Sequence, residues 1–245
     1  MLISMMKSRS SLTRLIGAGL LTASMAVGVA SAQDAAGDAN ARTPEIIVVP
    51  VEGGEAHFVV GQMAWGDTLG LLNQIHSQTD VPSDEMVQRL WIARDETPPF
   101  FLFELARLTA DSDPAFAVQA YFIGRARTMY DAARCLDSTA LDVINEASSY
   151  AGDTVIEVMA ERPELTVTAI ESLIASGGAF TGTASPWWAC SFGTNAYYAA
   201  VNGDTLSGNE WLMIESRWPS VRERISANLQ NNLEMLRTNM AAAAD

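Results

Sequence analysis

Hydrophobic residues recur at helical spacing over most of the chain, beginning near Trp65. Apolar residues three and four positions apart indicate helices that bury one face. Proline, glycine and capping residues interrupt this pattern at 97–99, 110–114, 162–163 and 176–178. The sequence therefore predicts a mainly α protein, organised as a helical-hairpin array or bundle. The apolar positions behind this prediction include Leu69, Leu72, Ile75, Val87, Leu90, Phe101, Leu105, Ala120, Ile123, Val155, Ile170, Leu173, Val221, Ile225, Leu229 and Leu233.

A different pattern precedes the helical region. The β-branched run 46–51 and a second run, 57–60, flank Gly53 and Gly54. Two such runs around a Gly-Gly turn are typical of a β-hairpin. Pro50 lies inside the first run and cannot donate a ladder hydrogen bond, so that strand is expected at an edge or cut short.

The longest stretch without a clear period, 180–209, is rich in glycine, serine and threonine but carries several aromatic residues. We expect it to be irregular, followed by a helix over 209–217 and a final helix from Ser220. In an extended segment, adjacent side chains point to opposite faces. Two interpretations remain open: an aromatic recognition surface, or a loop anchored by aromatic burial. The candidate binding residues here are Trp187, Trp188, Tyr197 and Tyr198.

The N-terminal 32 residues have the pattern of a secretory signal peptide. Basic residues (Lys7, Arg9 and Arg14) precede an uncharged apolar run at 15–29, and small residues at 30–32 offer a cleavage site. The run is shorter than the roughly 20 residues that cross a bilayer. We expect a signal peptide at 1–32, a flexible leader at 33–43 and a single mostly helical domain at 44–245. The protein is expected to be periplasmic or secreted, with no integral membrane span after cleavage. The start is left open among Met1, Met5 and Met6.

Charge narrows the expected partners. After signal removal, 12 basic residues face 29 acidic residues, a net charge of −17. Such a chain is repelled by nucleic acid and by anionic lipid, and we expect neither as a partner. The only lysine is Lys7, so the mature chain has no lysine for Schiff-base chemistry or for a phosphate-binding loop.

Cys135 and Cys190 are the only cysteines. An even number in an exported chain favours a disulfide between them. The alternative is a thiol nucleophile at Cys190, with His57 or His76 as its base.

Both histidines could also join a carboxylate such as Asp67 in a zinc site, since catalytic zinc needs only three protein ligands. A structural or exposed role for His57 and His76 is favoured instead. No serine-hydrolase elbow, zinc-helix or phosphate-loop motif is present. We therefore expect no metal and no cofactor.

Arg127 and Arg134 lie seven residues apart and share one face of a predicted helix. They could bind a carboxylate ligand. Pairing with acidic residues of the same chain, such as Asp131, is the favoured interpretation.

The stretch 98–131 contains Phe103-Glu104-Leu105-Ala106, Asp113-Pro114, Ala117, Tyr121 and Gly124. These residues resemble the helical hairpins of Sel1-type and tetratricopeptide-type repeats. The resemblance implies a helix-hairpin scaffold whose function is protein binding.

Taken together, these patterns predict an exported, non-enzymatic helical protein that binds another protein. Two alternatives stay open: an enzyme with a site around Cys190 or His57/His76, and small-ligand binding by the Trp187-Trp188 segment.

The signal pattern predicts cleavage between Ala32 and Gln33, because small residues at 30 and 32 fit signal peptidase. Intact-mass analysis of the exported protein should give a chain that begins at Gln33. A cytoplasmic protein that keeps its first residues would contradict this.

Overall fold

The structure is a computed structural model that describes residues 45–51, 54–60, 72, 74–77, 83–202 and 208–244. The predicted signal peptide at 1–32 and leader at 33–43 lie outside these residues. Strands β1 (Glu45–Val51) and β2 (Gly54–Val60) pair antiparallel, with Glu45 opposite Val60. Pro50 lies opposite Glu55 in this two-stranded sheet, where every strand is an edge.

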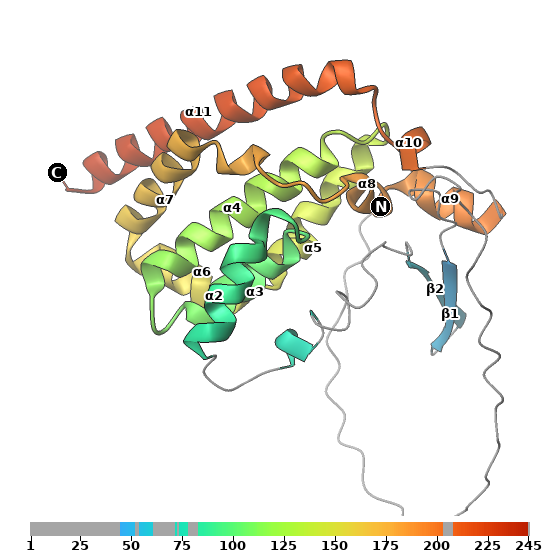
Figure 1. Cartoon of the computed structure of the whole chain (residues 1–245), viewed down its shortest axis with the longest axis horizontal. Coiled ribbons are helices and arrows are strands. Elements are labelled where there is room, and N and C mark those ends of the chain that lie inside the picture. Colours follow the sequence, from blue (N-terminus) through green and yellow to red (C-terminus); the bar gives the residue numbers. More distant parts are fainter. Residues whose placement is uncertain are drawn as a thin grey trace, which may run out of the picture. The chain divides into compact units, whose positions relative to one another are not determined.

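The part of the chain after residue 83 is mainly helical, as the sequence predicts (Figure 1). Within the described residues, no helix has both the length and the hydropathy to cross a bilayer. The α-helices are α2 (Asp84–Ile92), α3 (Phe100–Thr109), α4 (Pro114–Ala132), α5 (Val143–Ser149), α6 (Gly152–Glu161), α7 (Pro163–Ser176), α8 (Trp187–Cys190), α9 (Thr194–Asn202), α10 (Gly208–Trp211) and α11 (Trp218–Ala244). The 3-10 helices are η1 (Ala93–Asp95), η2 (Ser138–Asp142), η3 (Gly178–Phe180) and η4 (Glu215–Arg217).

Capping hydrogen bonds mark the starts of two helices. The Ser83 hydroxyl accepts from the Met86 amide at 3.2 Å and begins α2. The Asp113 carboxylate accepts from the Phe116 amide at 3.1 Å and begins α4, with Pro114 in the first turn. Each cap satisfies an amide that has no partner inside the helix.

Helix α4 is the central element of the core. It packs against α3, α5, α6, α7 and α8, and it is buried along most of its length. At Gly124 a methyl group would lie 3.1 Å from Leu102 Cβ and 3.3 Å from Phe103 Cζ on α3. The missing side chain therefore lets α3 and α4 approach closely.

The prediction of an irregular stretch over 180–209 was wrong in part. Residues 187–190 form α8 and residues 194–202 form α9. The helix expected over 209–217 was also too long. The helix ends at Trp211. Leu212 then forms an isolated antiparallel bridge with Cys135, and η4 follows. Short helices fixed by tertiary contacts carry little periodic signal of their own.

The last helix closes the core, as its apolar stripe predicts. Val221, Ile225 and Leu233 on α11 are buried. Figure 1 shows α11 running beside α7, and Arg237 forms an ion pair with Glu171 between the two helices. The helix begins at Trp218, two residues before the expected Ser220.

Replacement of Gly124 by valine should lower the free energy of unfolding by about 1–3 kcal/mol, because the side chain would overpack the α3–α4 contact. Exposed Ala227 on α11 is the control. Ala227→Val should change stability by less than about 0.7 kcal/mol, since it alters only helix propensity. Urea unfolding followed by circular dichroism measures both. Equal losses in the two variants would contradict the close approach.

Candidate functional site

The predicted disulfide between Cys135 and Cys190 is confirmed. The two Cα atoms lie 5.4 Å apart, and both residues are buried. The bond joins the segment just after α4 to the last residue of α8. Because both cysteines are used, Cys190 offers no thiolate nucleophile in this state.

Trp187 and Trp188 are both buried, so neither ring is a surface recognition element in this structure. The Trp188 indole N–H donates to Asp131 Oδ2 at 2.7 Å. Adjacent side chains take opposite faces only in an extended segment. Residues 187–190 form the helical turn α8 inside the core, where both neighbouring rings are covered.

Arg134 is fully engaged by nearby groups. It forms an ion pair with Asp131, and its guanidinium stacks over the Tyr130 ring at 4.0 Å and the Trp218 ring at 4.7 Å. Its Nε donates to the Tyr130 carbonyl at 3.3 Å. Arg134 therefore pairs with an acidic residue of the same chain, which was the favoured interpretation.

Arg127 links three segments of the chain. It forms an ion pair with Asp95 on η1, and Nε donates to the Gly178 carbonyl at 2.9 Å. Its other nitrogens donate to the Arg94 carbonyl and the Thr181 hydroxyl, both at 2.5 Å. Ion pairing is again confirmed, but with Asp95 in place of Asp131. The structure therefore does not bring Arg127 and Arg134 together as an open carboxylate site.

The two tyrosines are the candidate binding residues that face solvent. Tyr197 is 41% exposed and Tyr198 is 59% exposed on α9. Their ring centroids lie 5.7 Å apart in an edge-to-face arrangement. Aromatic rings with a polar tip are common in protein interfaces, so this pair is suited to contact another molecule.

A second exposed apolar group adjoins the disulfide. The Leu136 amide donates to the Trp211 carbonyl and the Met213 amide donates to the Arg134 carbonyl, each at 2.9 Å. These bonds flank the Cys135–Leu212 bridge. Leu136 follows Cys135 of the bridge directly and is 64% exposed. Ile214 lies two residues after Leu212 and is 68% exposed. We call Leu136, Leu212, Met213, Ile214 and Trp218 the disulfide surface.

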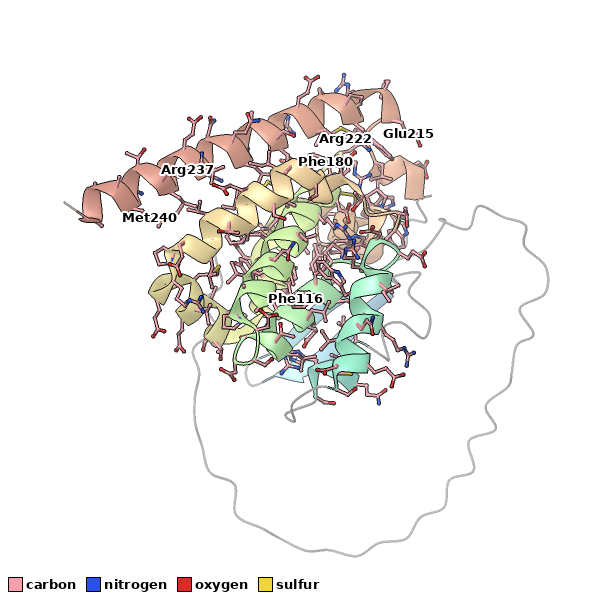
Figure 2. The ribbon with its side chains drawn as sticks, turned by 60° about the vertical axis from the view of Figure 1, so that its left-hand side comes forward. Phe116, Phe180, Glu215, Arg222, Arg237 and Met240 are labelled. Atoms are coloured by element: carbon pink, nitrogen blue, oxygen red, sulfur yellow. A yellow bond between two sulfur atoms is a disulfide. The ribbon has the colours of Figure 1, made fainter. Side chains whose placement is uncertain are left out.

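The disulfide surface contains a groove of about 300 Å³ lined by Leu212, Met213, Ile214, Glu215 and Trp218. The Trp218 indole N–H donates to the Met213 carbonyl at 3.1 Å, which fixes the ring on the groove wall. Figure 2 shows Glu215 near the start of α11, at the same end of that helix as Arg222. The groove therefore combines apolar walls with one carboxylate.

The sequence analysis did not identify Glu104 as a buried charged residue. Glu104 on α3 is completely buried. One oxygen contacts His76 Nδ1 and the other accepts from Arg107 Nε at 2.8 Å. The His76 ring also lies 5.0 Å from the Tyr150 ring. The signal was present, because Glu104 falls three residues after Phe101, on the apolar face of its helix.

The Glu104 group holds the segment before α2 against the core. Arg107 donates to the Ile75 carbonyl at 3.0 Å in addition to binding Glu104. Buried charge is tolerated when it is paired and hydrogen-bonded. Within the described part of the chain, no group of three histidine, cysteine or acidic side chains could hold a metal ion. The side chain of His57, on β2, is not described.

Burial and pairing shift the pKa values of several groups, among them three aspartates and one tyrosine, in different directions. Burial raises the pKa of Asp131, although Arg134 and Trp188 oppose the shift. Partial burial would raise the pKa of Asp95 as well, but the hydrogen bond and charge of Arg127 bring the net pKa below its usual value. Hydrogen bonds from Asn195 and Thr139 likewise outweigh burial and lower the pKa of Asp137. Burial, with the charges of Glu146 and Glu104, raises the pKa of Tyr150.

Comparisons with protein-family models, with curated proteins and with solved structures found no match. The resemblance of 98–131 to Sel1-type and tetratricopeptide-type hairpins therefore stays a prediction.

Removal of the Asp131 carboxylate should be strongly destabilising, because Arg134 and the Trp188 N–H would be left buried without their partner. Asp131→Ala should cost about 3–5 kcal/mol. The exposed Glu171–Arg237 pair is the control, and Glu171→Ala should cost less than about 1 kcal/mol. Denaturant unfolding gives both values. Similar small losses would show that Asp131 is not an essential buried partner.

Acid should remove the contribution of Asp95. Its pKa is lowered in the folded state, so the unfolded chain binds more protons below the ordinary pKa of about 3.9. The stabilisation is complete above that pKa and is lost as pH falls through the folded pKa. Urea unfolding between pH 6 and 2.5 should therefore show a shallower loss of stability for Asp95→Asn than for the wild type. Identical pH slopes would contradict the pairing with Arg127.

Proposed function

We propose that the chain is an exported, non-enzymatic helical protein of the cell envelope or secreted space that binds another protein. The exposed disulfide surface carries this proposal. Leu136 and Ile214 are more than 60% exposed beside a groove whose backbone is held by a disulfide and by bridge hydrogen bonds. Apolar residues on a fixed backbone suit binding, because little conformational entropy is lost when a partner covers them.

The helical body supports this proposal as a scaffold. We infer that α3 and α4, with the helices packed around them, form a helical-hairpin bundle. Export is proposed from the signal pattern, and a disulfide is common in oxidising compartments. Tyr197 and Tyr198 on α9 would extend the binding surface, since Asn195 at the start of α9 donates to Asp137, next to Leu136.

The two alternatives have less support. A thiol enzyme needs a free Cys190, which the disulfide consumes. Small-ligand binding by Trp187 and Trp188 needs an exposed ring, and both rings are buried. The His76–Glu104 pair ties a segment to α3, which is a structural use of both groups.

Site-specific photo-crosslinking in the exporting cell tests the proposal. A photoreactive residue at position 214 should give a discrete crosslinked species on a denaturing gel. The same residue at Ile92, which is 69% exposed at the end of α2, is the matched control and should give none. Equal crosslinking at both positions, or none at 214 in correctly exported protein, would overturn the proposal.

A further inference from the structure

The Trp218 ring is part of the groove wall, and two of its contacts lead to one buried residue. The Arg134 guanidinium lies 4.7 Å from the centroid of the Trp218 ring. The indole N–H of Trp218 donates to the Met213 carbonyl at 3.1 Å. The Met213 amide in turn donates to the Arg134 carbonyl at 2.9 Å. Arg134 therefore supports the ring twice, directly with its side chain and indirectly through the backbone of Met213.

The orientation of Arg134 is set from inside the protein. The residue is buried, and its charge is paired with Asp131. Its Nε donates to the Tyr130 carbonyl at 3.3 Å, and its guanidinium lies 4.0 Å from the centroid of the Tyr130 ring. A planar guanidinium with an ion pair, a hydrogen bond and a stacked ring has little freedom to turn. Trp218 is thus in contact with a fixed interior group.

A second arginine lies near the same rings but contacts them less closely. The Arg222 guanidinium is 5.4 Å from the Tyr130 centroid and 5.7 Å from the Phe180 centroid. Figure 2 shows Arg222 and Phe180 near the start of α11, and the structure leaves Arg222 exposed. Cation–π attraction is stronger where water is excluded, which favours the buried Arg134.

We propose that Arg134 is the positioning residue of the groove and holds the Trp218 wall in place before a partner arrives. The inference rests on the proposed function and adds the residue that sets the shape of its site. A wall fixed in advance loses less conformational entropy on binding, so the partner binds more tightly. Because Arg134 is buried, it acts through Trp218 and does not touch the partner.

Exchange of the Trp218 indole proton with heavy water tests the support of the ring. Arg134→Lys keeps a positive charge for Asp131 but loses the planar group that stacks on the ring. The variant should exchange the Trp218 indole proton about fivefold faster, as expected for the loss of one cation–π contact. Nitrogen-15 NMR of the mature protein measures the rate, and Trp218→Phe assigns the signal by its disappearance.

Two controls separate positioning from a general loosening of the core. Arg94 stacks on Trp91 at 4.3 Å, so Arg94→Lys makes the same change at another arginine–tryptophan pair and should leave the Trp218 rate unchanged. Within Arg134→Lys itself, the Trp188 indole N–H, which donates to Asp131, should keep its exchange rate. Equal acceleration at Trp188 and Trp218, or none at Trp218, would overturn the proposal.

Crosslinking from position 214 in the exporting cell tests the effect on binding. Arg134→Lys should lower the yield of the crosslinked species about twofold or more, whereas Arg94→Lys should not change it. Trp218→Leu should lower the yield as well. The combined variant should crosslink as well as Trp218→Leu alone, because an effect that passes through Trp218 is lost with that ring.

The failures of the two proposals can be told apart. A wild-type crosslink at 214 that Arg134→Lys leaves unchanged would overturn the positioning role and keep the protein-binding function. A further loss in the combined variant would also overturn it, since Arg134 would then act by another route. Absence of the crosslink from the exported wild type would remove the binding function itself, and the role of Arg134 in that function with it.

Discussion

A carboxylate buried without solvent must find charge and hydrogen-bond partners inside the protein, and Asp131 imposes this constraint on the core. Its oxygens bind Arg134 and the Trp188 indole. Trp188 lies on α8, far along the chain, so satisfying the carboxylate places α8 against the end of α4. The disulfide joins α8 to Cys135, three residues after the end of α4. The position of α8, and of the segments that hydrogen-bond beside it, depends on this paired contact.

Buried charge follows one rule elsewhere in the fold. Glu104 and Arg127 are both buried, and each has at least one partner from a distant segment. Glu104 holds His76 and Arg107, and Arg127 holds η1 and the segment after α7. Because an unpaired buried charge is costly, these groups fix which segments cover α3 and α4. Apolar contact alone would specify those positions less strictly.

The sequence predicted the long elements well because their signals are local. The caps Ser83 and Asp113 and the apolar stripes of α3, α4 and α11 are all readable within a few turns. The disulfide followed from a count of two. The short helices α8 and α9 were missed because contacts far along the chain decide them. The same holds for Arg127, whose partner Asp95 lies 32 residues away and outside any periodic pattern.

The candidate site, too, could be predicted from the sequence only in part. The sequence singled out Trp187 and Trp188 by their chemistry, but burial depends on the surrounding fold and assigns them to the core. The disulfide surface arises from the bridge between Cys135 and Leu212, which lie far apart in the sequence. Exposure of Leu136 and Ile214 is a property of that pairing. No pattern within either segment could have indicated it.

The disulfide also changes how the chain responds to cutting. Its cysteines are 55 residues apart, and the enclosed loop contains α5, α6 and α7 and most of α8. A protease that cuts one peptide bond inside this loop leaves both products covalently joined through Cys135 and Cys190. In the intact chain α4 also packs against α7 and α8. A nicked molecule would therefore travel as a single species until a reductant opened the bond, so damage in this region need not release the surface that the disulfide supports.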